Sequence, residues 1–230
     1  MTPHDRVWLV PLWKNAEKEG YGLLSTEEKA FLSTLRHPAR RLEWICGRIL
    51  LKRMITEDSP APRSWEDFGQ KILPTVRKRF SAWTVRTRNS RNQGIPPRIF
   101  VENQPHPTHF SLSHTAGHLA AVSFQEDFPV GCDLCSSESF SQTMQRLFLH
   151  SEERKLLSLN ASKIPAEIFW GGKEAAYKAY SLRHSEAFHP LHWQIRLSAC
   201  QWTVIHHSGQ VFSLEIRQKS SLFLILAREG

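Results

Sequence analysis

Polar side chains that could do chemistry stand at the edges of apolar runs in three segments of the second half of the chain. These segments are FSLSHT at 110–115, VGCDL at 130–134 and WGGKEAAYKA at 170–179. Asp133 lies at the end of an apolar, strand-like run, whereas Glu174 and Lys178 are four residues apart and share one face of a predicted helix. Such acids can meet at one hard cation, because Mg²⁺ prefers a few carboxylates together with water and phosphate oxygens.

Each of these residues also has an ordinary structural interpretation. Asp133 is the kind of residue that caps a strand at a turn, and His114 is the kind found in hydrogen-bonded loops. Glu174 and Lys178 would then be a surface pair on a helix, worth only about 0.3–0.5 kcal/mol. The ordinary interpretation is favoured for each residue singly, and the joint order of the segments is what favours a site.

The sequence that surrounds these segments predicts an α+β fold. In the first half, Ser25 with the acids after it is a helix-start signature, and apolar residues recur at helical spacing from Pro38 to about Ile55 beside a basic face. Other elements predicted there are a strand over Arg6–Leu12, a partly helical stretch over Trp65–Phe80, a strand over Trp83–Arg86 and turns over Asn89–Pro97.

The second half repeats the combination of strands with one dominant helix. It predicts strands over Leu119–Phe124 and Val130–Leu134, short helices over Ser139–Asn160, a strong helix over Pro165–Leu182 and a β-meander over Leu191–Ala227. A proline-punctuated link at 104–107 separates the halves, so we expect residues 1–105 and 106–230 to form two similar α+β halves, a pseudo-dimer. A cleft between such halves is the expected ligand site.

The amino-acid composition limits the classes of partner that the protein is expected to bind. The 230 residues carry a net charge of +8, which favours anionic partners such as phosphorylated cofactors, acidic proteins or nucleic acid. The apolar run Val7–Trp13 is interrupted by Pro11 and is too short for a signal sequence or a membrane span, so we expect a cytoplasmic protein.

Cysteine and histidine patterns predict no transition-metal site. Of the 4 cysteines, only Cys132 and Cys135 form a C-x-x-C pair, and a structural zinc site would need a second pair or histidines at ligand spacing. We expect reduced thiols in the core. His206 and His207 fall in a predicted strand and need no function.

In their order, the S-H-T, G-x-D and W-x-x-K-E-x-x-x-K segments resemble the signature of the Sfp-type 4′-phosphopantetheinyl transferases. The stretch RRLEWICGR at 40–48 is similar to the arginine-rich helix with a G-R pair in that family, so the resemblance covers both halves. It implies transfer of the phosphopantetheine arm of coenzyme A to a serine of an acyl or peptidyl carrier protein, with Mg²⁺ and no membrane or nucleic-acid partner, by a monomer.

The resemblance also implies a role for individual residues. Asp133 and Glu174 would hold the Mg²⁺ that bridges the pyrophosphate, and Glu174 would accept the proton of the carrier serine. Lys178 would hold the phosphate and screen the acids, with Lys173 adding positive potential nearby. The coenzyme would be bound by Ser113 and His114 of the S-H-T segment. From the basic helix it would be bound by Arg40 rather than by Arg41 or Arg48.

Two positions depart from the family pattern. Cys135 stands where most members have a third carboxylate, for which Glu138 is a candidate substitute, and Ile95 stands where the family has a lysine that contacts the coenzyme. Arg88, Arg91 and Arg98 are candidate replacements for that lysine. Two alternatives therefore stay open: an inactive relative that binds coenzyme A or a carrier protein, and a nucleic-acid-binding protein that uses the basic and aromatic residues over Arg77–Arg91.

Overall fold

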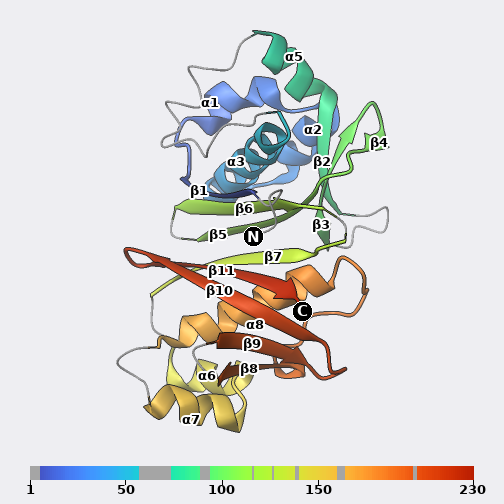
Figure 1. Cartoon of the computed structure of the whole chain (residues 1–230). Helices are drawn as coiled ribbons and strands as arrows, with labels where there is room; N and C mark the ends of the chain where they lie inside the picture. Colours follow the sequence, from blue (N-terminus) through green and yellow to red (C-terminus); the bar gives the residue numbers. More distant parts are fainter. Residues whose placement is uncertain are drawn as a thin grey trace. The chain divides into compact units, whose positions relative to one another are not determined.

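The computed structural model describes residues 6–56, 74–88, 94–115, 117–125, 127–137, 140–159, 164–198 and 201–230 (Figure 1). In these residues the chain forms α-helices and three antiparallel sheets, which confirms the predicted α+β class. It divides into two compact units, Met1–Glu126 (unit 1) and Asp127–Gly230 (unit 2).

Unit 1 combines helices with two small sheets. Its helices are α1 (Ala16–Gly20), the 3₁₀ turn η1 (Tyr21–Leu23), α2 (Thr26–Thr34), α3 (Pro38–Met54) and α5 (Pro74–Ala82). Its strands are β1 (Arg6–Pro11), β2 (Trp83–Arg88), β3 (Gly94–Val101), β4 (Gln104–Pro105), β5 (His109–Thr115) and β6 (His118–Phe124). They pair in the orders β1-β6-β5 and β2-β3-β4, and β3 also contacts β5.

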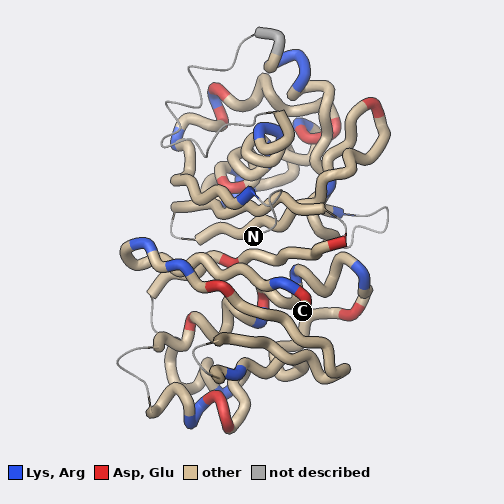
Figure 2. The backbone as a smooth tube through the Cα atoms, viewed as in Figure 1, with Lys and Arg blue, Asp and Glu red and all other residues tan. Residues whose placement is uncertain are grey.

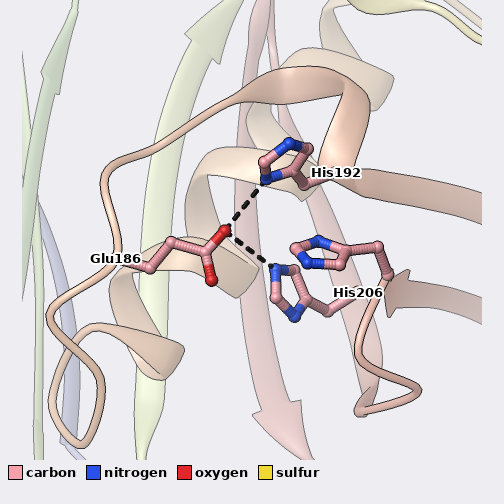
Figure 3. A group of neighbouring side chains, drawn as sticks. Glu186, His192 and His206 are labelled. Atoms are coloured by element: carbon pink, nitrogen blue, oxygen red, sulfur yellow. Dashed lines mark hydrogen bonds and ion pairs between the residues drawn. The ribbon is translucent and has the colours of Figure 1, made fainter.

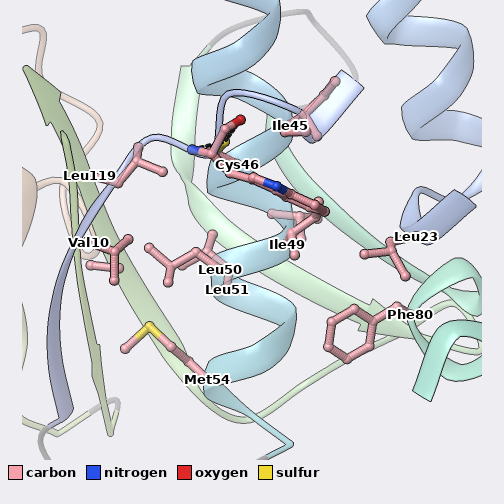
Figure 4. Close-up of a cluster of buried hydrophobic side chains, with 14 of the residues drawn as sticks. Val10, Leu23, Ile45, Cys46, Ile49, Leu50, Leu51, Met54, Phe80 and Leu119 are labelled. Carbon is pink, nitrogen blue, oxygen red and sulfur yellow. Dashed lines mark hydrogen bonds between the residues drawn. The ribbon is translucent and has the colours of Figure 1, made fainter. Parts of the chain in front are cut away.

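Local signals explain the two main helices of unit 1. Ser25 accepts a hydrogen bond from the backbone N–H of Glu28, whose carboxylate accepts one from the backbone N–H of Ser25, so α2 begins at the predicted capping box. Pro38 opens α3 at a position where its missing N–H costs nothing. The apolar face of α3 forms the core of unit 1 together with β1, β6 and α5 (Figure 4).

Unit 2 is one helix-covered sheet. Its helices are α6 (Gln142–Phe148), α7 (Ser151–Leu159), α8 (Ala166–Tyr180) and the 3₁₀ turn η2 (Pro190–His192). Its strands are β7 (Val130–Ser136), β8 (Trp193–Ser198), β9 (Gln201–His206), β10 (Val211–Lys219) and β11 (Leu222–Glu229), which pair in the order β7-β11-β10-β9-β8. Helix α8 packs on this sheet, mainly against β7 and β11 (Figure 1).

Two glycines let α8 approach β7 closely. A Cβ atom added to Gly131 of β7 would lie 1.8 Å from the carbonyl oxygen of Ala175 in α8. A Cβ atom added to Gly171 of α8 would lie 3.1 Å from Oδ2 of Asp133. The backbones of strand and helix are therefore in direct contact at the point where Asp133 projects.

Several predicted elements are confirmed and one is wrong. The strong helix expected over Pro165–Leu182 is α8, and the helix expected from Pro38 is α3. The turns expected over Asn89–Pro97 are wrong from Gly94 onward, where the chain forms β3. Strand β3 pairs with β2 at Gly94 and again at Arg98–Val101. Its two prolines lie between these paired positions, so their missing N–H groups remove no hydrogen bond from the sheet. Residues 57–73 of the stretch around the expected Trp65–Phe80 helix lie outside the described residues.

The division between the units lies later in the chain than the link at residues 104–107. Strand β6 pairs with β1, and β5 pairs with β6, so the segment His109–Phe124 belongs to unit 1 by strand pairing. Basic and acidic positions are interspersed along the trace of both units (Figure 2). None of the helices in the described residues is long and apolar enough to cross a membrane.

Candidate functional site

Strand β7 and helix α8 bring Asp133, Glu174 and Lys178 together in unit 2. The ammonium group of Lys178 donates a hydrogen bond to Oδ1 of Asp133 at 2.7 Å and another to the carbonyl oxygen of Cys132 at 3.1 Å. It lies 3.8 Å from Oε2 of Glu174, one helical turn earlier. Two carboxylates and one ammonium group, from a strand and a helix that are distant in the sequence, thus lie close together.

The electrostatics of this trio are those of two acids that compete for one cation. Partial burial, reinforced by the charge of Asp133, raises the pKa of Glu174 to about 7. Burial opposes the charged form of Lys178, but Asp133 and Glu174 outweigh it and raise the pKa of this lysine. Lys178 is therefore a charged ammonium group that offsets part of the negative charge, and the site retains a surplus of carboxylate.

The donor set fits a hard divalent cation. Asp133 and Glu174 both offer carboxylate oxygens, the ligands that Mg²⁺ prefers, and the side chain of Glu174 is 30% exposed, so water and a phosphate can reach it. Cys135 lies two residues beyond Asp133, on the same face of β7, but its thiol is buried and donates toward the carbonyl oxygens of Glu167 and Phe223. Burial raises the pKa of that thiol, which makes it a poor ligand for Mg²⁺.

The candidate coenzyme-binding residues lie in unit 1. Nη1 of Arg40 on α3 lies 2.9 Å from Nε2 of His114 on β5 and 3.5 Å from Oε2 of Glu43. The side chain of Arg40 is 59% exposed, and the predicted pair of Arg40 and His114 therefore forms one accessible basic group with Glu43 beside it.

Ser113 does not join this group. Strand residues alternate between faces, and Leu112 of β5 faces α3, where its side chain lies 3.0 Å from the place of a Cβ atom on Gly47. His114 shares that face, whereas Ser113 is buried on the other face of the sheet. The adjacent predicted ligands Ser113 and His114 thus point to opposite sides of β5.

Arg41 and Arg48 on α3 are occupied by structural contacts. Arg41 donates to the carbonyl oxygens of Leu32 and Leu35 at the end of α2. Arg48 is buried, lies over the ring of Trp44 at 3.9 Å and donates to Oγ1 of Thr87. Arg40 is consequently the most exposed of these three arginines, and it is the one that the sequence predicts to bind the coenzyme.

Lys173 makes structural contacts, whereas we expected it to add positive potential near the site. Its side chain is fully buried and its ammonium group lies 2.8 Å from Oε2 of Glu153 on α7. It also donates to the carbonyl oxygen of Phe148. Lys173 therefore ties α8 to α6 and α7, and its charge is neutralised inside the unit.

Two further residues contact these groups and were not predicted from the sequence as site residues. Trp170, for which the sequence predicts a packing role, forms a side-chain hydrogen bond with Glu174 one turn later on α8. Glu43 lies three residues after Arg40 and contacts both Arg40 and His114. Helical spacings of three and four residues were the available signals for both.

The replacements proposed for missing family groups are only partly described. Ile95 and Arg98 lie on β3, and Arg98 pairs across the sheet with Arg86 of β2. Arg86, part of the basic stretch over Arg77–Arg91, is engaged with Glu27 on α2 and lies over the ring of Phe100. Glu138 and Arg91 lie outside the described residues.

Comparison of the chain with protein-family models gives no match, and comparison with curated protein sequences gives none either.

Proposed function

We propose that the protein is a Mg²⁺-dependent 4′-phosphopantetheinyl transferase that uses coenzyme A to modify a serine of an acyl or peptidyl carrier protein. The observation that carries the proposal is the convergence of Asp133, Glu174 and Lys178, with the Lys178 ammonium group 2.7 Å from Oδ1 of Asp133. A partly buried, carboxylate-rich site with one fixed cation suits a reaction in which a pyrophosphate is bound and split.

The proposed reaction is a substitution at phosphorus. The serine oxygen of the carrier forms a bond to the phosphorus atom that bears the pantetheine arm, and the bond from that phosphorus to the bridging oxygen of the pyrophosphate breaks. Adenosine 3′,5′-bisphosphate leaves, and Glu174 accepts the serine proton directly or through water. Mg²⁺ held by Asp133 and Glu174 would offset the charge that develops on the leaving phosphate.

Lys178 and Trp170 would orient this chemistry. Lys178 holds the Asp133 carboxylate in place through a hydrogen bond, and its ammonium group would bind phosphate oxygens. Trp170 donates to the Glu174 carboxylate, which favours the ionised form that can take up a proton. Arg40 and His114 would bind the phosphates of the adenosine end of the coenzyme.

A repeated buried ion pair supports the proposal that units 1 and 2 are the two similar halves of a pseudo-dimer. In each unit a lysine in the long helix pairs with a glutamate in the preceding helix, Lys52 with Glu28 and Lys173 with Glu153, and all four side chains are at most 1% exposed. In each unit that glutamate accepts backbone N–H groups from the residue three before it and from a strand: Ser25 and Val85 in unit 1, His150 and Ile195 in unit 2.

Strand order supports the same proposal. In unit 2 it is β7-β11-β10-β9-β8, and in unit 1 it is β1-β6-β5 followed by β3, which contacts β5, and then β2. The first strand of each unit pairs with its last, and the long helix packs against strands of that pair: α3 against β6 in unit 1, and α8 against β7 and β11 in unit 2. The expectation that the coenzyme binds between the halves, like the expected monomeric state and cytoplasmic location, stays a prediction.

The decisive experiment is a mass measurement on an apo carrier protein. The full chain is incubated with the carrier, coenzyme A and Mg²⁺, and the carrier is expected to gain the mass of one phosphopantetheine group. Asp133→Asn and Glu174→Gln are each expected to abolish the gain, and Lys178→Met to lower kcat roughly 100-fold. Glu152→Gln, which changes an exposed carboxylate on α7, is the matched control and is expected to leave the rate unchanged.

Three results would overturn the proposal. If either acid variant retained more than a few per cent of the wild-type rate, the assignment of Asp133 and Glu174 as the metal ligands would be wrong. Binding of coenzyme A without modification of several carrier types would identify a binding protein instead, and steeply salt-dependent binding of oligonucleotides with no response to coenzyme A would identify a nucleic-acid-binding protein.

A further inference from the structure

We infer that unit 2 contains a four-ligand site for a transition-metal ion, of which Zn²⁺ is the expected occupant, formed by Glu186, His192, His206 and His207. One ligand atom from each of these side chains lies within 4.8 Å of the others. The site shares no residue with the proposed transferase site, so either proposal can fail without the other.

Three segments of unit 2 converge to form the cluster. Glu186 lies in the loop that follows α8, His192 ends the 3₁₀ turn η2, and His206 and His207 lie at the end of β9 and in the turn after it. The backbone N–H of His207 donates to the carbonyl oxygen of His192 at 2.8 Å, which fixes these two segments side by side. The hydroxyl of Tyr177 on α8 donates to the carbonyl oxygen of Glu186, which fixes the third.

The distances suit a single tetrahedral ion. Four ligand atoms 2.0–2.2 Å from Zn²⁺ lie about 3.3 Å from one another. Oε1 of Glu186 is 2.9 Å from Nδ1 of His192 and 3.7 Å from Nε2 of His206, so the observed separations bracket that value (Figure 3). Small side-chain movements would bring the ligand atoms, which all lie within 4.8 Å of one another, to this spacing.

His206 gives an independent sign of a ligand. Its side chain is 1% exposed, and among the described residues its buried Nε2 atom has no hydrogen-bond partner. Leaving a buried polar atom unpaired is costly, and buried nitrogen atoms of this kind are rare. This nitrogen points at the carboxylate of Glu186, toward the centre of the cluster (Figure 3).

The cluster also has the outer contacts that hold metal ligands in place. Nδ1 of His206 lies 2.8 Å from the hydroxyl of Ser208, an arrangement in which Nδ1–H donates and Nε2 keeps its lone pair for a metal. The hydroxyl of Tyr180 donates to Oε2 of Glu186, the oxygen on the other side of that carboxylate.

The ligand chemistry selects the class of metal. Three imidazoles and one carboxylate suit Zn²⁺ and its neighbours in the first transition row, whereas Mg²⁺ and Ca²⁺ prefer oxygen ligands alone. Four protein ligands fill a tetrahedral shell and leave no open position for a substrate, so this zinc would be structural. It would tie the loop after α8 to η2 and to the β9–β10 turn, and so brace the end of the helix that carries Glu174 and Lys178.

Zinc content tests the inference directly. Full-length protein without a histidine tag is stripped with a chelator, incubated with Zn²⁺ in the presence of excess Mg²⁺, desalted, and analysed by mass spectrometry for metal. About one zinc per chain is expected. At free Zn²⁺ 100-fold above the dissociation constant, the melting temperature should rise by roughly 5–10 °C. Bound Co²⁺ should show the intense visible absorption of a tetrahedral site.

Matched variants locate the metal. His192→Asn and Glu186→Gln, which change half-buried side chains, are expected to weaken zinc binding at least 10-fold and to abolish the thermal shift while keeping the circular dichroism of the wild type. His189→Asn, whose exposed ring stacks on His192 but offers no ligand, should bind normally. Glu174→Gln should also bind normally.

The inference is overturned if the wild type retains no zinc. It is also overturned if the His192→Asn and Glu186→Gln variants bind as the wild type does, or if Glu174→Gln removes the zinc, because the ion would then belong to the carboxylate site.

Discussion

The contact between Gly131 and α8 gives the sharpest test of how the Asp133 site is built. In Gly131→Ala the new methyl carbon would lie 1.8 Å from the carbonyl oxygen of Ala175 and 2.7 Å from the backbone nitrogen of Ala179. Ordinary contacts of carbon with carbonyl oxygen are about 3.3 Å or longer, so strand and helix must separate by about 1.5 Å. Both obstructing atoms belong to the backbone of α8, so no side-chain rotation can relieve the clash.

That separation has a cost in stability and in geometry. Overpacking of a core costs about 1–3 kcal/mol when side chains can adjust, and here we expect about 3 kcal/mol or more. For a chain of this size, such a loss lowers the melting temperature by roughly 6–12 °C. The same movement would stretch the 2.7 Å contact between Lys178 and Asp133 beyond hydrogen-bonding distance and lower the transferase rate.

Thermal and denaturant unfolding, together with the carrier-modification rate, measure both effects. Gly22→Ala is the matched control, because a Cβ atom there meets nothing within 4 Å, and its free energy of unfolding should change by less than about 0.5 kcal/mol. A Gly131→Ala protein within about 1 kcal/mol of the wild type would refute the close approach of β7 and α8. A destabilised variant with normal activity would show that the approach does not position Asp133.

Two further predictions concern buried groups. Lys173→Met leaves the carboxylate of Glu153 buried without its counterion, so the free energy of unfolding in urea should fall by about 3–5 kcal/mol. Lys155→Met, which changes an exposed lysine on the same helix as Glu153, is the control and should change it by less than about 0.5 kcal/mol. Equal losses in the two variants would contradict the buried ion pair. Burial raises the pKa of Cys46 to about 12, so at pH 8 its thiol stays protonated in the folded protein and ionises only after unfolding. Iodoacetamide should then label Cys46 in denaturant and not in native buffer, and native labelling at the denatured rate would argue against its burial.

The parts of this protein that the sequence determined are those governed by short-range physics. The capping box at Ser25 and Glu28 spans four residues, and the periodicity of α3 and α8 is repeated within every two turns. The spacing of Glu174 and Lys178 places them on one helix face whatever surrounds them. These features need no knowledge of the rest of the chain.

Tertiary structure decided what each local group meets. Lys173 and Lys178 are close neighbours on α8, yet packing buries the first against Glu153 and turns the second toward Asp133. The sequence predicts that adjacent Ser113 and His114 both bind the coenzyme, but the alternation of side chains along β5 places them on opposite faces of the sheet.

The Glu186–histidine cluster is the clearest case of tertiary control. His206 and His207 are adjacent in the sequence, but His192 and Glu186 lie in other segments, and no spacing rule for metal ligands joins them. The register of β8 with β9, which sets Trp193 opposite His206, brings η2 to the end of β9 and completes the group. Strand register depends on which faces are buried in the assembled sheet, and a short window of sequence does not contain that information.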